Sequence, residues 1–321
     1  MRIISPTPSS YDDEDISNIR NIGEEIKVVL RVRPLNERET DLDVIKSSAG
    51  LRSWKILNEY NAITQILTDD TDVKPSTANK KRAPSRSIYT YDRVYDESNQ
   101  TKEIYEFVAR ENVLHAVSGR NASIFAYGQT SSGKTYTMQG SESISRCMES
   151  KKQGFIHLAA ADIFHEIGKS KDRDYKVFAS VIEVYNEYVR DLLVDIDSSQ
   201  TNSLKITENS KNNGIYVNPI KKEAKSLSQL LAILGSGENK RSVAETSLNK
   251  RSSRSHLIYS IVLESKPRRG TSAFPNRTHD MEITQISTLN LIDLAGSESV
   301  RHRSDDISYK SRKEGGNINK R

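Results

Sequence analysis

Residues 123–135 read Ser-Ile-Phe-Ala-Tyr-Gly-Gln-Thr-Ser-Ser-Gly-Lys-Thr, and this stretch decides the fold class. Its first five residues form an apolar, β-prone run, and its last eight match the pattern G-x-x-x-x-G-K-[ST]. A strand that runs through a glycine-rich turn into a helix brings backbone amides and the positive end of the helix together, which suits a phosphate group. The stretch therefore predicts a phosphate-binding loop (P-loop) in an α/β sheet. A glycine- and serine-rich turn without a ligand is the alternative that the pattern leaves open.

Each residue type in this loop has an expected task. Gly128 and Gly133 would let backbone amides approach the phosphates closely. Lys134 would place its ammonium group against the β- and γ-phosphates, and Thr135 would offer its hydroxyl to Mg²⁺. The loop residues expected to bind the nucleotide are Gly128, Gln129, Thr130, Ser131, Ser132, Gly133, Lys134 and Thr135.

Two later segments carry groups that such a loop needs. Asp293 ends the apolar run 286–293, where its carboxylate suits a Mg²⁺ role, and Gly296 could turn its amide toward the γ-phosphate. Residues 249–256 (Asn-Lys-Arg-Ser-Ser-Arg-Ser-His) supply hydroxyls and an arginine just before another expected strand. Alone, either segment would pass as an incidental polar loop. Together with the P-loop they indicate a nucleoside triphosphatase whose two loops sense the γ-phosphate.

The remaining chain alternates predicted strands and helices, which favours an α/β fold with a sheet that is flanked by helices on both faces. Pro34 stops the first strand because it cannot donate in a sheet ladder. We expect Thr101 to cap the first helix and Gly119 to end it. The expected strands are 26–33, 175–185, 256–264 and a central one at 286–293, with short strands within 43–70; the expected helices are 101–118, 154–167 and 227–234.

Composition excludes several classes of protein. The chain has 321 residues, enough for one large domain or two, with one cysteine and six scattered histidines. Neither an internal disulfide nor a zinc site is expected from these counts and spacings. No run of 18 apolar residues suggests a membrane span, and the first 30 residues lack a secretory signal. We therefore expect a cytoplasmic protein that binds neither membrane nor nucleic acid.

Charge is distributed unevenly along the chain. Residues 1–25 read as a flexible acidic arm with six acidic and two basic residues, a formal charge of −4. Because the whole chain carries +5, the remainder carries +9. Residues 71–87 form a basic, proline- and serine-rich stretch that we expect to be an exposed loop. A basic excess of this size indicates an acidic partner, with an ordinary solvated surface as the alternative.

The chain resembles the kinesin motor domain. The resemblance covers about residues 26–320 and its motifs stand in the family's order. It is carried by VVLRVRPLNERE (28–39), YTYDRVYDES (89–98), FAYGQTSSGKTYTM (125–138), SVIEVYNEYVRDLL (180–193), NKRSSRSH (249–256) and LIDLAGSE (291–298).

The resemblance implies ATP and Mg²⁺ as ligands and assigns residues to them. Arg31, Arg33 and Pro34 would flank the adenine, where a guanidinium group can stack on the base. Ser253 would join Thr135 and Asp293 around Mg²⁺.

For catalysis, the resemblance implies that Ser252 positions the attacking water and that Gly296 is the pivot that senses the γ-phosphate. Arg254 and Glu298 would pair across the two switch segments in the hydrolysing state and shield that water from solvent. The implied activity is microtubule-stimulated ATP hydrolysis coupled to movement.

The implied partner is the microtubule, whose acidic surface suits the basic excess. Residues 299–321 hold seven bases against three acids, a net +4, and follow the second switch. Lys221 and Lys222 lie where a second tubulin contact would be expected, with a solvated strand edge as the alternative. The implied location is the cytoplasm and the microtubule cytoskeleton, with the spindle suggested by similarity to the centromere-associated, mitotic branch.

The sequence departs from the family at its end. It stops within KEGGNINK, so we expect residues 1–25 to be a disordered arm and residues 26–321 to be a motor domain that is incomplete at its C-terminal side. The expected fold is a P-loop kinesin-type fold that lacks the C-terminal helices and one core strand; dimerisation would need sequence absent from this chain. The alternatives are a truncated, non-motile microtubule- or nucleotide-binding module without productive turnover, and an unrelated P-loop ATPase or GTPase.

Overall fold

A computed structural model describes most of the region that carries these motifs. The described residues are 26–36, 39, 54–65, 88–145, 152–194, 203–209, 214–245, 254–268 and 284–298. The predictions for the acidic arm, the basic stretch 71–87, Ser252, Ser253 and the basic segment 299–321 lie outside the described residues. The chain divides into two compact units, Met1–Leu30 with Leu51–Val94, and Arg31–Gly50 with Tyr95–Arg321.

The first unit contains a three-stranded antiparallel sheet in the order β2-β3-β4. A short 3₁₀ turn and Asn61, with φ of 46°, reverse the chain between β2 and β3. The strands β2 and β3 confirm the short strands expected within 43–70. The bounds are β2 (Trp54–Leu57), η1 (Asn58–Tyr60), β3 (Ala62–Gln65) and β4 (Ile88–Thr90).

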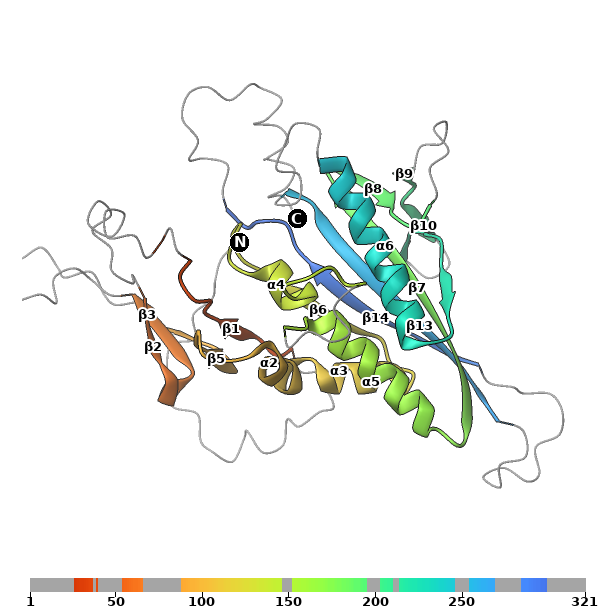
Figure 1. Ribbon diagram of the computed structural model, residues 1–321, viewed down its shortest axis with the longest axis horizontal. Helices are drawn as coiled ribbons and strands as arrows, with labels where there is room; N and C mark the ends of the chain where they lie inside the picture. The colour runs from red at the N-terminus through yellow and green to blue at the C-terminus, as the bar shows by residue number, and fades with distance from the viewer. Residues whose placement is uncertain are drawn as a thin grey trace, which may run out of the picture. The chain divides into compact units, whose positions relative to one another are not determined.

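The second unit is built on a seven-stranded mixed sheet (Figure 1). Its order is β6-β14-β13-β7-β8-β9, with β12 paired to β7. β14 runs parallel to β6 and antiparallel to β13, so the expected central strand is confirmed. The bounds are β6 (Ala122–Ala126), β7 (Arg173–Tyr185), β8 (Tyr188–Asp191), β9 (Ser203–Leu204), β12 (Lys222–Ala224), β13 (His256–Pro267) and β14 (Gln285–Asp293).

Two further pairs of strands complete the described sheets. β1 (Val29–Arg31) pairs with β5 (Arg93–Tyr95), and β10 (Thr207–Asn209) with β11 (Gly214–Tyr216). β1 is shorter than the strand predicted over 26–33, although the amide of Val32 still donates to the carbonyl of Tyr95 at 2.8 Å.

The first predicted helix was wrong in two details. Residues 101–118 form two helices, α2 (Thr101–Val108) and α3 (Arg110–Val117), and the side chain of Asn112 bonds the carbonyl of Val108 beside the break. Gln100 is the N-cap in place of Thr101, because the Glu103 carboxylate accepts the Gln100 amide at 3.1 Å. Gly119, with φ of 96°, ends α3 as expected.

The other described helices are α4 (Lys134–Gln139), α5 (Phe155–Lys169) and α6 (Leu227–Glu245). The prediction ended α6 at residue 234, because two glycines and a run of polar residues follow. Gly237 packs directly on Val181 of β7, where a Cβ atom would lie 2.8 Å from the valine side chain. Tertiary packing therefore extends the helix past residues of low helix propensity.

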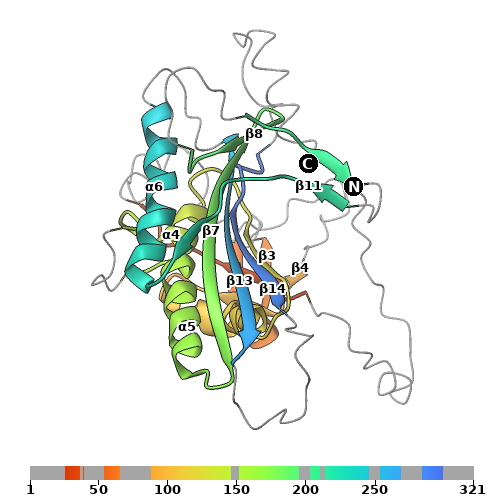
Figure 2. The same ribbon diagram turned by 90° about the vertical axis from the view of Figure 1, so that its right-hand side faces the viewer.

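The described helices that contact the sheet do so from one face (Figure 2). Ser287 bonds to α3, Asp293 to α4, and Glu183 pairs with α6, and these side chains all project from the same side of the sheet. The opposite face carries Phe125, which is 59% exposed. The mixed sheet with helices is confirmed, and helices on the second face remain a prediction.

Candidate nucleotide site

The predicted P-loop lies between the end of β6 at Ala126 and the start of α4 at Lys134. Its backbone takes conformations that glycine favours, since Gly133 has φ of 100°. At Gly128, a Cβ atom would lie 2.5 Å from Oγ of Ser132. Both glycines have positive φ, which other residues rarely adopt. Their role in bringing amides to the phosphates remains a prediction.

Lys134 turns its side chain back into the loop. Its Nζ donates to the carbonyl oxygens of Gly128 at 2.9 Å and Gln129 at 2.7 Å. Burial lowers the pKa of the ammonium group, while Asp293 and Glu298 act in the opposite direction. A cation held by neutral carbonyls can exchange them for the oxygens of an anion at small cost.

Thr135 and Asp293 meet as the sequence predicted. The Thr135 hydroxyl donates to Oδ2 of Asp293 at 2.6 Å, joining the start of α4 to the end of β14. Asp293 is only 3% exposed, and its Oδ1 has no hydrogen-bond partner among the described residues. Burial raises the pKa of this carboxyl, opposed by Thr135, Arg241 and Lys134. A buried carboxylate oxygen without a donor is suited to a cation or to its water ligands.

The segment after β14 lies along the P-loop. It continues the parallel pairing: the amide of Leu294 donates to Ala126 at 3.3 Å, and the amide of Ser297 to Gly128 at 3.1 Å. A Cβ atom at Gly296 would overlap the Glu298 carboxylate and Oγ1 of Thr130, so any larger residue would displace these side chains. The role of Gly296 as the pivot that senses the γ-phosphate remains a prediction.

Glu298 contacts the P-loop directly. One carboxylate oxygen accepts the Thr130 amide at 2.9 Å, and the other accepts the Thr130 hydroxyl. Burial would raise the pKa of Glu298, but hydrogen bonds, first among them the one from the Thr130 hydroxyl, and the charge of Lys134 together lower it. The sequence did not anticipate this contact. Arg254 forms a short turn before β13, and its pairing with Glu298 remains a prediction.

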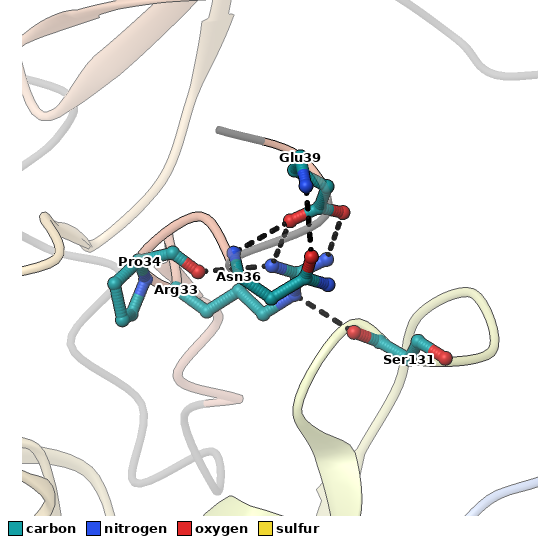
Figure 3. A network of polar contacts seen from close by, with 5 residues as sticks. All are labelled: Arg33, Pro34, Asn36, Glu39 and Ser131. Atoms are coloured by element: carbon teal, nitrogen blue, oxygen red, sulfur yellow. Dashed lines mark hydrogen bonds and ion pairs between the residues drawn. The ribbon is translucent and has the colours of Figure 1, made fainter. Parts of the chain in front are cut away.

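Arg33 is tied to the loop by a network that the sequence analysis missed (Figure 3). Its Nε donates to the carbonyl of Ser131 at 2.8 Å, and its two terminal nitrogens grip Glu39 at 2.7 Å each. The hydrogen bonds from Arg33 lower the pKa of Glu39 to about 2. Glu39 stands in the quoted motif VVLRVRPLNERE, where a carboxylate six residues after an arginine was the available signal. The role of Arg33 and the exposed Pro34 at the adenine remains a prediction.

Arg31 contacts α4 instead of the loop. Its guanidinium donates to Oγ1 of Thr137 at 2.9 Å and lies 5.1 Å from the ring centre of Tyr136. Burial lowers the pKa of Arg31, which the Tyr136 hydroxyl opposes. Tyr136 follows the phosphate-loop threonine and is 39% exposed. The motif pattern ends at Thr135, so the sequence analysis did not single out this aromatic surface.

Other classes of site find no support in the described residues. No group of three or more His, Cys, Asp and Glu side chains there could hold a metal ion by itself. None of the described helices combines a length of 18 residues with the hydropathy that a bilayer requires.

This geometry defines a P-loop nucleotide-binding protein: a glycine-dependent loop, an inward lysine, and a buried strand-end aspartate bonded to the loop threonine. The chain belongs to the kinesin motor domain family, whose family model matches residues 31–321. The resemblance to the kinesin motor domain that the sequence motifs indicated is confirmed.

Curated relatives support this assignment. The chain is 36% identical over 300 residues to the kinesin-like protein KIN-7C, mitochondrial, of Arabidopsis thaliana, covering 93% of this chain and 28% of the relative. It is 42% identical over 236 residues to kinesin-related protein 11 of Dictyostelium discoideum, covering 72% and 32%. Human centromere-associated protein E is 35% identical over 296 residues, covering 92% and 9%, which confirms the similarity to that branch. The chain thus spans at most about a third of these relatives.

Among solved structures, a fast kinesin that was described with its ATPase mechanism and microtubule interactions matches with a TM-score of 0.69. It is 29% identical in sequence and the match covers 89% of this chain and 70% of that one. The α/β kinesin fold is confirmed, and a kinesin motor domain implies nucleotide binding.

Proposed function

We propose that this chain is an ATP-dependent microtubule motor domain that binds and hydrolyses ATP and couples hydrolysis to microtubule binding and movement. The observation that carries the proposal is the Thr135–Asp293 hydrogen bond at 2.6 Å beneath a P-loop on which residues 294–298 lie. This arrangement joins a phosphate cradle to a segment that can respond to the terminal phosphate.

The residues present fit a Mg²⁺-bound triphosphate. Thr135 would bind the ion directly, and the unpartnered Oδ1 of Asp293 would accept a hydrogen from a water ligand. Ser253 is proposed as a further Mg²⁺ ligand, and Ser252 as the residue that positions the attacking water. When bound, Mg²⁺ would neutralise charge on the phosphate oxygens and so assist the departure of the leaving group.

The chain's own groups would act by exchanging partners. Lys134 would leave the carbonyls of Gly128 and Gln129 for phosphate oxygens. The Thr130 amide would leave Glu298 in the same way, which releases that carboxylate toward Arg254. The exchange keeps each charged group paired before and after binding, so little desolvation energy is lost.

The adenine base would lie near Arg31 and Pro34. Arg31 above Tyr136, together with Pro34, offers a guanidinium and aromatic surface adjacent to the helix of the P-loop. We propose adenine as the base, because a guanidinium group such as that of Arg31 can stack on it. Arg33 is proposed to hold the loop in place through Ser131.

Membership of the kinesin family associates the chain with the cytoskeleton and the microtubule. We propose that Lys221, which is exposed, and Lys222 at the start of β12 contribute to an electrostatic contact with tubulin. We also propose the cytoplasm, with the spindle as a site, from the similarity to centromere-associated protein E.

The test is phosphate release by the purified chain with ATP, with and without microtubules, over a salt series. Stimulation that weakens as salt rises supports a microtubule-activated ATPase. Microtubule binding without stimulation would instead support a non-motile binding module. Absence of nucleotide binding would refute the proposal.

A further inference from the structure

Arg241 is a buried arginine in the last turns of α6, and only 8% of it is exposed. Its NH2 group donates to the hydroxyl of Ser255 at 2.9 Å and to the Ser255 carbonyl at 3.4 Å. Its Nε lies 3.9 Å from Oε1 of Glu183, which is also buried. A buried cation needs such partners, because removing it from water costs several kcal/mol.

The position of this group relates it to the nucleotide site. Glu183 of β7, Leu257 of β13 and Asp293 of β14 are consecutive partners across the sheet. Their side chains project toward the helices, and Arg241 of α6 lies beside Glu183, two strands away from Asp293. Its positive charge opposes the rise in the pKa of Asp293 that burial causes.

A chain of direct contacts continues from Ser255 to the P-loop. The next residue, His256, accepts the Ala295 amide on its Nδ1 at 3.1 Å. Two residues after Ala295, the amide of Ser297 donates to Gly128. The start of β13 therefore supports the segment 294–298 from one side, while the P-loop contacts it from the other.

We propose that Arg241 is a positioning residue for the nucleotide site. By bonding both the hydroxyl and the carbonyl of Ser255, it fixes the position of the start of β13. In that position His256 can accept the hydrogen bond from the Ala295 amide. That contact in turn holds residues 294–298 on the P-loop. The effect on turnover rests on the proposed function; the mechanical link between Arg241 and residues 294–298 does not.

The decisive variant is Arg241→Lys in the full chain. Lysine keeps the positive charge beside Glu183, so the buried carboxylate retains a cation. Its single nitrogen cannot also reach Ser255, because in Arg241 one nitrogen lies beside Glu183 and a different one bonds Ser255. Lys240→Met is the matched control. Lys240 is the neighbouring residue of α6, and its Nζ donates to the carbonyl of Val194 at 2.8 Å.

Two measurements separate the mechanical link from the function. In Arg241→Lys, amide hydrogen exchange of residues 294–298 is expected to accelerate by about fivefold, with the amides of α5 unchanged. The kcat for ATP is expected to fall by about tenfold while KM stays within about threefold, because the loss concerns geometry and not binding. Ser255→Ala should give a smaller effect, because it removes only the hydroxyl contact and leaves the Ser255 carbonyl bonded. It should add nothing to Arg241→Lys, in which both contacts are lost.

The outcomes are distinguishable. The proposal would be overturned if amide exchange of residues 294–298 in Arg241→Lys equalled that in Lys240→Met. It would also be overturned if a lower kcat came with a comparable rise in KM and a lower melting temperature, because that pattern indicates a merely structural pair. If exchange accelerates as expected but the unaltered chain neither binds nor hydrolyses ATP, the positioning link stands and the proposed function fails.

Discussion

The backbone amide of Thr130 donates a 2.9 Å hydrogen bond to the carboxylate of Glu298, which lies 168 residues further along the chain. The Thr130 hydroxyl donates to the same carboxylate. In a phosphate-binding loop, such amides face anionic oxygens. Glu298 thus occupies a donor that a phosphate would also use, so nucleotide and Glu298 are expected to compete for it.

Glu298→Ala should therefore bind nucleotide at least as tightly as the unaltered chain but hydrolyse it more slowly. Removal of the Glu298 carboxylate favours nucleotide binding, because it frees the Thr130 amide for phosphate. Loss of the partner for Arg254 impairs the hydrolysing state in which the two switch segments pair. Affinity is measured with a fluorescent ATP analogue, and hydrolysis by single-turnover phosphate release. The exposed Glu208→Ala serves as the control. Weaker binding in Glu298→Ala would argue against competition.

The Arg254–Glu298 pair itself is tested by a double-mutant cycle. Arg254→Ala and Glu298→Ala should each slow hydrolysis by about tenfold or more, and the double variant should be little worse than either. The pairing is mutual, so removing either partner removes the same interaction. Losses that add in the double variant would mean that the two residues act separately.

Lys134→Ala should abolish ATP turnover and weaken nucleotide affinity by at least about 100-fold, because it removes the ammonium group that the loop carbonyls hold in place for the phosphates. The melting temperature should change little, since the lysine bonds only exposed or part-buried loop carbonyls. Equilibrium binding measures the nucleotide affinity, and calorimetry measures the melting temperature. Lys152→Ala, on an exposed position, is the comparison. Normal turnover would contradict the phosphate site.

Asp293→Asn should stabilise the chain in the absence of nucleotide. It should also make nucleotide binding independent of Mg²⁺. The folded pKa of Asp293 is raised, so the ionised carboxylate disfavours the fold. That penalty is absent below the unfolded pKa of about 3.9 and is complete once pH exceeds the folded value. Asparagine can still accept from Thr135 but carries no charge. The melting temperature is therefore expected to rise by a few degrees at pH 7, and the difference should shrink as pH falls toward 4. An unchanged or lower melting temperature at pH 7 would refute this reading.

Glu39→Gln should lower nucleotide affinity by several-fold, because Arg33 loses the partner that orients it toward Ser131. The pKa of Glu39 is lowered to about 2. The stabilisation is therefore present above the unfolded pKa of about 4.3 and is lost as pH falls through about 2, so the effect of the variant should be constant from pH 5 to 8. Fluorescent nucleotide titrations at pH 5 and 8 measure it. A defect that changes markedly across this range would exclude the ion pair as its cause.

Local pattern sufficed for much of the site. The glycines, Lys134 and Thr135 follow from a motif in which residue type and spacing are dictated by backbone approach to phosphate. Asp293 followed from its place at the end of an apolar run. The existence of the strands 175–185, 256–264 and 286–293 followed from alternation and apolar runs, because each strand's side-chain period is set by its own backbone.

Tertiary structure alone decided the contacts between distant segments. Thr130 with Glu298, Arg33 with Ser131, and Arg241 with Ser255 join residues that no local period relates. The length of α6 belongs here too, because Gly237 is tolerated only where it packs on Val181. A sequence states which groups are available, but the pairing of sheet strands determines which carboxylate and which amide face one another, since only the register brings them within hydrogen-bonding distance.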